Sequence, residues 1–261
     1  MSHFRRVCVV ARGDEAEVLR ARLLELVPAG IEERESGHSV ELSAYVPVEH
    51  VERLRAALPE AVVEPVPDGW EEAWRAFHRP ASAGGLWLGP PWESPPEPAR
   101  AVVIDPGRAF GTGSHATTRL CVELLARAPR GSLLDVGCGS GVLAIAGVRL
   151  GFGPVVAVDV DPVAVETTRA NTKANGVALE TRLLDALEGT LPHADVAVAN
   201  VLLAPVEAIL VRLQATEAIT SGYLVGERPA HLGWEHVETA ALDGWAADRF
   251  RRASRSRAVS V

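Results

Sequence analysis

The chain has 261 residues, of which 48% are hydrophobic, and a formal net charge of −8 at pH 7. This length fits one large domain, or a small domain beside one of roughly 150 to 180 residues. The acidic balance disfavours a direct nucleic-acid substrate, because phosphate binding relies on clustered lysine and arginine. No apolar run reaches the roughly 18 residues of a membrane span, and the start does not resemble a signal peptide, so we expect a cytoplasmic protein away from membranes.

The first 67 residues predict a small α+β domain. Its apolar patterns indicate strands over 4–10, 30–35, 38–46 and 61–66, and helices over 14–27 and 48–58. This β-α-β-β-α-β order matches the ferredoxin-like fold. Titratable residues do not cluster in it, so residues 1–67 are assigned to partner recognition, with a purely structural role as the alternative.

Residues 68–100 are expected to be a linker helix and a connecting segment. Trp70, Trp74 and Phe77 follow helical spacing, which favours core contacts. The stretch 79–100 is rich in proline and glycine, which predicts a linker or a pair of short strands.

From residue 101 to 261 the pattern becomes that of an α/β domain. Strands are expected over 133–136, 155–159, 180–184 and 196–200, with helices over 117–128, 141–150, 162–175 and 204–213. Alternation of apolar strands with helices predicts a parallel sheet that is covered on both faces. Its ligand should lie beyond the carboxyl ends of the strands, where Asp159, Asp185 and Asn200 fall.

The carboxyl-terminal region is expected to complete the sheet in antiparallel fashion. Apolar segments lie at 219–225, 234–242 and 245–250, with Asp243-Gly244 as a hairpin turn. Only 227–231 remains for a crossing helix, which is too short for one. The last arginines predict an edge strand and a solvated tail: they are Arg249, Arg251, Arg252, Arg255 and Arg257.

A glycine-rich turn links the first of these strands to its helix. Its glycines, Gly137, Gly139 and Gly141, allow close approach of a ligand to the backbone, and the helix that follows offers free N–H groups. The dinucleotide fingerprint G-x-G-x-x-G would need a small residue where Val142 stands, so a nicotinamide-dependent dehydrogenase is disfavoured. The G-x-G-x-G form resembles motif I of the S-adenosylmethionine-dependent methyltransferases.

Four segments extend this likeness: DPGRAFGTGSHATT, DVGCGSGVLAIA, VAVDVDPVAVETTRANTKANGV and DVAVANVLLAPV. Together with the linker EEAWRAFHRP and the small first domain, they closely resemble the ribosomal protein L11 methyltransferase family. The most specific part is F-G-T-G-x-H-x-T-T, which ordinary methyltransferases lack. The shortened carboxyl-terminal part departs from the family.

This resemblance implies a Rossmann-like methyltransferase sheet with helices on both faces, preceded by a ferredoxin-like domain that recognises the ribosomal protein. It implies S-adenosylmethionine as the cofactor and repeated methylation of amino groups of L11. Cofactor contacts fall by resemblance on Thr118, Gly137, Asp159 and Asn200.

Residue chemistry agrees with three of these contacts. Gly137, with Gly139 beside it, lets a ligand approach the backbone. Asp159 ends the next strand and can accept hydrogen bonds from both ribose hydroxyls, as strand-end carboxylates do. The alternative role of Asp159 as a helix cap suits Asp161 better, because Pro162 follows it as a first-turn residue.

Asn200 is the candidate catalytic residue, since it ends a strand where this fold orients the methyl acceptor or the cofactor. Its alternative is to begin the turn before Ala204. In glutamine and adenine methyltransferases this position opens N-P-P-[YF], whereas Val201-Leu202-Leu203 follows here. A planar amide or base is therefore disfavoured as the acceptor.

Other candidates lie on loops. Phe110, Gly111, Thr112 and Gly113 are expected to form a loop over the cofactor, with Phe110 excluding water. His115 is expected to tether that loop rather than to act as a base. Asp185 is either a partner of the adenine amino group or a surface aspartate. The cysteines have no C-x-x-C partner, so no metal site is expected.

The predicted reaction transfers methyl groups to lysine side chains, to the N-terminal α-amine, or to both. No general base stands out, so desolvation and orientation by Asn200 are expected to serve the acceptor. A monomer is expected. The alternatives are a related protein-lysine methyltransferase with a different target, and a cofactor-binding ribosome-associated factor without turnover.

Overall fold

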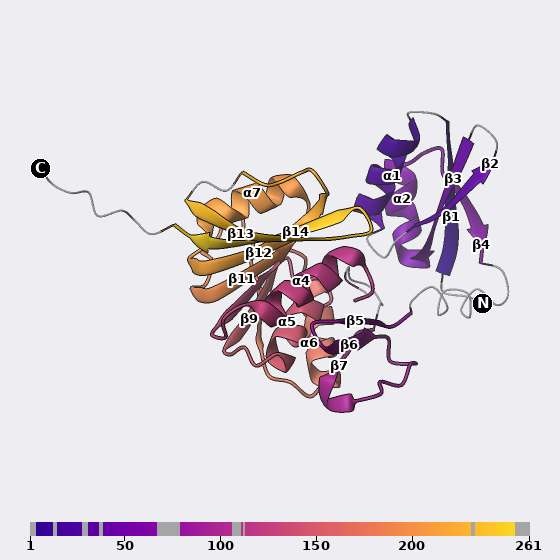
Figure 1. The fold of residues 1–261 in the computed structure, drawn as a ribbon. Coiled ribbons are helices and arrows are strands. Elements are labelled where there is room, and N and C mark those ends of the chain that lie inside the picture. Colours follow the sequence, from indigo (N-terminus) through magenta and orange to yellow (C-terminus); the bar gives the residue numbers. More distant parts are fainter. Residues whose placement is uncertain are drawn as a thin grey trace, which may run out of the picture. The chain divides into compact units, whose positions relative to one another are not determined.

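A computed structural model describes residues 4–12, 15–27, 31–36, 39–66, 79–105, 111, 113–230 and 233–253. The chain divides into two compact units, Met1–Phe77 and His78–Val261. Among the described residues, the first unit has one sheet and the second has two (Figure 1). Each unit also has its own hydrophobic core. Trp70, Trp74 and Phe77 lie outside the described residues.

The first unit is a four-stranded antiparallel sheet with two α-helices. Its elements follow the order β1 (Phe4–Arg12), α1 (Glu15–Leu26), β2 (Glu32–Ser36), β3 (Ser39–Pro47), a short 3-10 helix (Val48–His50), α2 (Val51–Ala57) and β4 (Val62–Pro65). The strand order in the sheet is β2-β3-β1-β4. Val7, Leu23, Leu42 and Leu58 are fully buried between the sheet and the helices, which is the apolar contact that holds this unit together.

The second unit is built on a seven-stranded sheet. Its main elements are α4 (Ala116–Arg127), β8 (Leu133–Val136), α5 (Val142–Arg149), β9 (Val155–Asp159), α6 (Pro162–Ala174), β10 (Glu180–Leu183), β11 (Ala194–Asn200), α7 (Leu203–Arg212), β12 (Ala215–Leu224), β13 (Trp234–Leu242) and β14 (Trp245–Arg252). The strand order is β10-β9-β8-β11-β12-β14-β13. The strands from β10 to β12 in this order are parallel, and β14 runs antiparallel to both of its neighbours.

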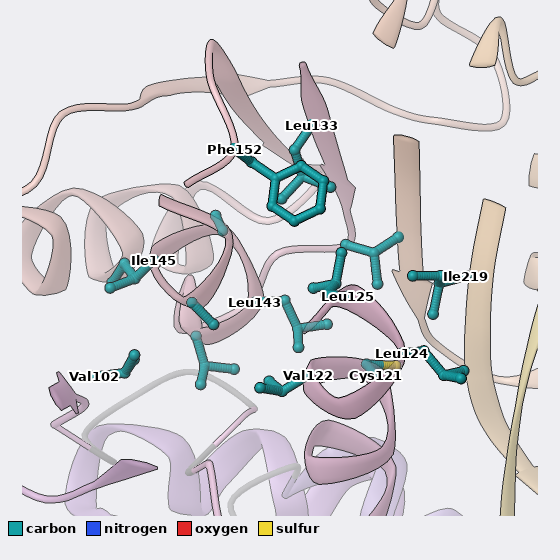
Figure 2. Close-up of a cluster of buried hydrophobic side chains, with 14 of the residues drawn as sticks. Val102, Cys121, Val122, Leu124, Leu125, Leu133, Leu143, Ile145, Phe152 and Ile219 are labelled. Carbon is teal, nitrogen blue, oxygen red and sulfur yellow. The ribbon is translucent and has the colours of Figure 1, made fainter. Parts of the chain in front are cut away.

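Both faces of this sheet are covered. Leu133 belongs to the hydrophobic cluster that contains side chains of α4 and α5, whereas Leu134 belongs to the cluster that contains side chains of α7. Successive strand residues point to opposite faces, so a strand buried on both faces has to be apolar throughout. Figure 2 shows the first cluster, in which Leu125, Leu143 and Phe152 pack beside the sheet. The predicted α/β sheet with helices on both faces is confirmed.

Part of the stretch expected as a connection forms strands of the second unit. β5 (Ala81–Ala83) and β6 (Leu86–Gly89) make a hairpin, and β6 pairs in parallel with β7 (Ala101–Val103). A further 3-10 helix, Pro98–Arg100, precedes β7. Leu86 and Leu88 are buried in the same cluster as α4 and α5, so apolar burial holds this small sheet to the unit.

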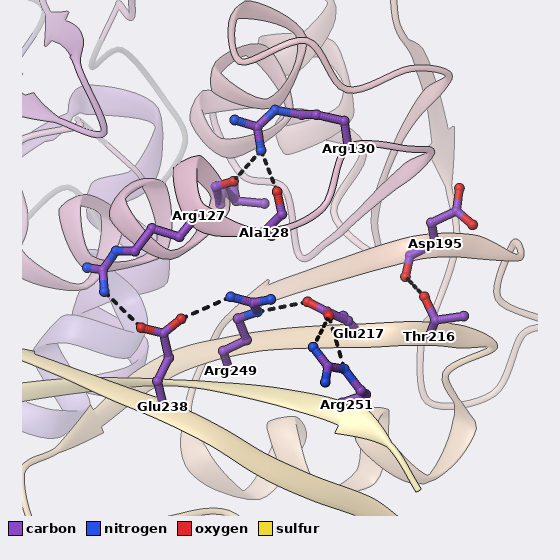
Figure 3. A network of polar contacts seen from close by, with 10 residues as sticks. Arg127, Ala128, Arg130, Asp195, Thr216, Glu217, Glu238, Arg249 and Arg251 are labelled. Carbon is purple, nitrogen blue, oxygen red and sulfur yellow. Dashed lines mark hydrogen bonds and ion pairs between the residues drawn. The ribbon is translucent and has the colours of Figure 1, made fainter. Parts of the chain in front are cut away.

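The carboxyl-terminal strands differ in two ways from the sequence prediction. β12 is parallel to β11 rather than antiparallel. β14 lies between β12 and β13, so the prediction of an arginine-bearing edge strand is wrong. The arginines are tolerated there because carboxylates pair with them: Arg249 contacts Glu217 at 2.7 Å and Glu238 at 3.0 Å (Figure 3).

The connection from β12 to β13 forms no helix over its described residues, 225–230 and 233. Polar contacts fasten it instead. Arg228 lies 3.6 Å from the buried carboxylate of Asp248, and the Ala230 amide donates to Glu207 of α7. No helix within the described part of the chain is long and apolar enough to span a membrane.

Glu217→Ala is expected to destabilise the protein by about 1.5–3 kcal/mol, because the buried guanidinium of Arg249 loses one of its two carboxylate partners and keeps only Glu238. Glu217 is 4% exposed and accepts hydrogen bonds from Arg249 and Arg251. Urea unfolding at pH 7 measures the effect. Glu235→Ala, at an exposed position of β13, is the control and should shift the free energy of unfolding by less than about 0.5 kcal/mol. Equal shifts for the two variants would contradict the assigned role.

Candidate functional site

The glycine turn connects β8 to α5 through a backbone that only glycine adopts readily. Gly137, Gly139 and Gly141 have φ angles of 73°, 54° and 82°, in the left-handed region that disfavours side chains. The amides of Gly137 and Cys138 donate to the Val158 carbonyl of β9. The turn is therefore tied to the neighbouring strand, and it lies at the carboxyl edge of the sheet.

Three polar side chains hold the turn in this shape. Ser140 Oγ donates to the Gly111 carbonyl at 2.6 Å, and Asn171 Nδ2 donates to the Ser140 carbonyl at 2.9 Å. Thr168 Oγ1 donates to the Gly139 carbonyl at 2.9 Å. All three side chains are buried. The loop before α4 and one face of α6 thus hold the turn rigidly, a role that the sequence prediction did not assign to any of them.

Asp159 lies at the end of β9, beside the turn. Its Oδ2 accepts from the Gly139 amide and its Oδ1 from the Asp161 amide, both at 2.9 Å. Asp161 caps α6 by accepting from the Val163 amide at 2.8 Å, with Pro162 as the first residue of the helix. The prediction that Asp161, rather than Asp159, caps this helix is confirmed. Asp159 is left half-buried at the sheet edge.

Asn200 ends β11 and reaches the first turn of α4. Its Nδ2 donates to Thr117 Oγ1 at 3.2 Å. His115 is the N-cap of α4, with its Nδ1 2.8 Å from the same Thr117 oxygen, and its ring makes an edge contact with Trp245 at 5.1 Å between centroids. Thr118, in the same turn, is fully buried, and its Oγ1 has no hydrogen-bond partner among the described residues.

The structure describes only some of the other predicted site residues. Gly111 is buried and holds Ser140 through its carbonyl, whereas Phe110 and Thr112 lie outside the described residues. Asp185 follows β10, and its Oδ1 accepts from the Leu187 amide at 2.7 Å within its own turn. That turn is compatible with either of the two roles foreseen for Asp185.

Asp135, a residue of β8 two positions before Gly137, was missed as a candidate. It is 1% exposed, and its Oδ2 accepts from the Ala144 amide of α5 at 3.0 Å. Its Oδ1 has no partner within the described part of the chain. Burial raises the pKa of Asp135 to about 7. The sequence does carry a signal for this candidate: a carboxylate interrupts an apolar strand that leads directly into a glycine turn.

Asp135→Asn is expected to stabilise the ligand-free protein at pH 8, by up to about 4 kcal/mol at roughly 1.4 kcal/mol per pKa unit. The folded-state pKa of about 7 exceeds the ordinary value of 3.8. Between these values the folded chain keeps a proton that the unfolded chain has released, so stability falls as pH rises towards 7. The asparagine side chain does not titrate, so the variant loses this pH dependence of stability.

Urea unfolding at pH 5 and pH 8 tests this prediction. The gain from Asp135→Asn should be about two to three times larger at pH 8 than at pH 5. Glu188→Gln, at an exposed position, is the control and should show no such difference. A variant that is equally stabilised at both pH values, or is destabilised at pH 8, would contradict the assignment.

The carboxyl edge of the sheet offers hydrogen-bonding groups for a polar ligand. The turn presents a bare backbone, Asp159 offers carboxylate oxygens at the strand end, and two buried oxygens, of Thr118 and Asp135, have no partner in the described ranges. Buried polar atoms are normally hydrogen-bonded, so these two oxygens are available to a ligand. Within the described residues, no group of His, Cys, Asp and Glu could hold a metal ion.

Comparison with known proteins decides the family. The family model described as "Ribosomal protein L11 methyltransferase (PrmA)" matches residues 38–252. The chain belongs to the ribosomal protein L11 methyltransferase family. The predicted family is confirmed, and with it the class of S-adenosylmethionine-dependent methyltransferases. This assignment rules out the dehydrogenase alternative.

Individual relatives agree with this family assignment. A ribosomal protein L11 methyltransferase of Legionella pneumophila (strain Lens) is 37% identical over 191 residues, which cover 68% of this chain and 66% of that protein. One of Pelobacter propionicus is 39% identical over 228 residues, with 77% and 72% covered. The crystal structure of a ribosomal protein L11 methylase from Lactobacillus delbrueckii subsp. bulgaricus aligns with a TM-score of 0.58 at 26% identity, covering 64% of this chain and 94% of that one. The chain thus spans about two thirds to three quarters of the length of these two curated relatives.

Proposed function

We propose that this chain transfers methyl groups from S-adenosylmethionine to amino groups of ribosomal protein L11, on lysine side chains, the N-terminal α-amine, or both. The observation that carries the proposal is the hydrogen bond from Asn200 to Thr117. It brings a strand-end carboxamide to the first turn of α4, next to the loop that holds the glycine turn. This arrangement, in a chain of this family, supports a site where cofactor and acceptor meet.

The cofactor would be held by groups on the carboxyl edge of the sheet. Asp159 would accept hydrogen bonds from the ribose hydroxyls, and Gly137 and Gly139 would let the ligand lie against the backbone. Thr118 Oγ1 would supply a hydrogen bond that the ligand-free chain leaves unmade. Phe110, Gly111 and Thr112 would cover the ligand, and Asp185 would reach its adenine. S-adenosylmethionine supplies a methyl group on a sulfonium, which is already a good leaving group.

The protein's task is then to orient the acceptor amine and to keep it neutral. A free lysine has a pKa near 10.4, so roughly one in a few thousand is uncharged at pH 7, whereas an α-amine near 7.7–8 is far more often neutral. Leu202, which is 61% exposed and two residues after Asn200, gives this edge an apolar surface. Apolar surroundings lower the pKa of an amine. Asn200 Oδ1 would accept a hydrogen bond from the amine and align it.

The remaining parts of the proposal concern partners. The first unit, with its separate core and sheet, would recognise the ribosomal protein. The acidic net charge of −8 suits a basic protein better than a nucleic acid. The enzyme would work in the cytoplasm as a monomer.

Labelled methyl transfer to purified L11, followed by mass spectrometry, tests the proposal. Methylated lysines or a methylated N-terminus are the expected products. Incubation with whole ribosomal protein, resolved by band, separates the alternatives. A label on a different band would indicate another protein target, and cofactor binding without any labelled band would indicate a factor that has lost turnover.

A further inference from the structure

Gly222 interrupts β12 at the level of the candidate site. The register of β12 with β14 shifts between Ser221 and Tyr223, and Gly222 itself has a φ of +106°. A Cβ placed on Gly222 would lie 2.0 Å from the Val201 carbonyl oxygen and 2.6 Å from the Val201 carbonyl carbon. The backbone of Val201 therefore occupies the space that a side chain at position 222 would need.

The other side of Val201 is confined in the same way. A Cβ placed on Gly137 would lie 2.7 Å from Val201 Cγ1. Val201 is thus held between two glycines, with its backbone against Gly222 and its side chain against the glycine turn. Since Val201 follows Asn200 directly, this contact joins the end of β11 to the proposed cofactor turn on one side and to β12 on the other.

The residues on either side of Gly222 are held in place by buried hydrogen bonds, so this segment of β12 does not move aside. Ser221 Oγ donates to the Ala246 carbonyl at 2.7 Å, and Tyr223 Oη donates to the buried Asp248 carboxylate at 3.0 Å. Both side chains are buried. A side chain at position 222 would consequently displace the Val201 peptide, by about 1 Å if the contact is to relax from 2.0 Å to the 3.0 Å limit for real Cβ atoms.

We propose that Gly222 is a positioning residue for methyl transfer: it leaves room for the Val201 peptide and thereby holds the carboxamide of Asn200 against Thr117 of α4. The inference rests on the proposed function. The hydrogen bond from Asn200 to Thr117 is 3.2 Å long, so a shift of this size breaks it. A misplacement of about 1 Å at a reacting centre can lower a rate by about 100-fold.

Gly222→Ala tests the proposal against Gly226→Ala. Gly226 has a φ of +98° with nothing within 4 Å of its added Cβ, so its substitution carries similar backbone strain without a collision. We expect kcat for labelled methyl transfer to fall about 10- to 100-fold in Gly222→Ala and less than about 2-fold in Gly226→Ala. Equal losses in the two variants would overturn the proposal, because strain alone would then explain them.

A double-mutant cycle separates positioning from a general loss of structure. In an Asn200→Ala background, Gly222→Ala should lower kcat no further, because the group that it positions is gone. Independent, multiplying losses would refute the proposal. If Gly222→Ala fails to fold, Val201→Ala tests the same proposal, because it removes the side chain that contacts Gly137 and leaves the Val201 peptide against Gly222. Its kcat should then fall less than about 2-fold, and a loss as large as that of Asn200→Ala would refute the proposal.

Failure of the proposed function has a different signature. If the wild-type chain transfers no methyl group to L11, the side-chain amide resonance of Asn200 in an NMR spectrum still reports on its position. That resonance should shift in Gly222→Ala and stay in place in Gly226→Ala. An unshifted Asn200 resonance in a folded Gly222→Ala protein would refute the positioning role by itself.

Discussion

Asp159→Asn is expected to weaken binding of S-adenosylmethionine about 100-fold or more. Both carboxylate oxygens of Asp159 face backbone N–H groups, of Gly139 and Asp161. An amide at this position would turn an NH₂ group towards one of those donors and would lose the negative charge that suits ribose hydroxyls. Hydrogen bonds to a charged group contribute roughly 1.5–3 kcal/mol each, and about 1.4 kcal/mol is a tenfold change in affinity.

Titration calorimetry with S-adenosylmethionine and with its demethylated product measures this effect. Asp161→Asn is the matched control, since asparagine caps helices about as well as aspartate does, and its affinity should change less than about threefold. Both ligands should be weakened alike by Asp159→Asn, because the ribose is common to them. Wild-type affinity in Asp159→Asn would remove Asp159 from the site.

The strands and helices of the second unit could be predicted because their patterns are local. Val155–Asp159, for example, is an apolar run that ends in a carboxylate, and β9 has the predicted bounds. Since parallel strands end at one edge, the common location of Asp159 and Asn200 also followed from the pattern. Strand order at the carboxyl end did not follow, because no local signal places β14 between β12 and β13.

What could not be predicted depends on contacts between distant residues. Ser140 and Gly111 are 29 positions apart, and Asn200 and Thr117 are 83 apart. Gly222 looks like any strand glycine until Val201 is seen against it. The burial that raises the pKa of Asp135 likewise depends on the helix that packs over it. Such contacts exist only in the folded chain.

Asn200→Ala is expected to lower kcat for methyl transfer about 100- to 1000-fold, the loss seen when one positioned polar group is removed from a reacting centre. The alanine cannot accept a hydrogen bond from the acceptor amine, and it also loses the contact with Thr117. Single-turnover transfer to L11 measures the chemical step apart from product release.

Two further measurements show whether Asn200 orients the amine or removes its proton. An asparagine does not titrate, so the rate of Asn200→Ala should rise with pH as that of the wild type does, at a lower level throughout. Thr117→Val, which removes the oxygen that both Asn200 and His115 contact, should cause a smaller loss, about 10-fold. A changed pH profile in Asn200→Ala would point to a base that acts through this residue. Full turnover with normal cofactor binding would remove Asn200 from the chemistry and leave it as the start of the turn before α7.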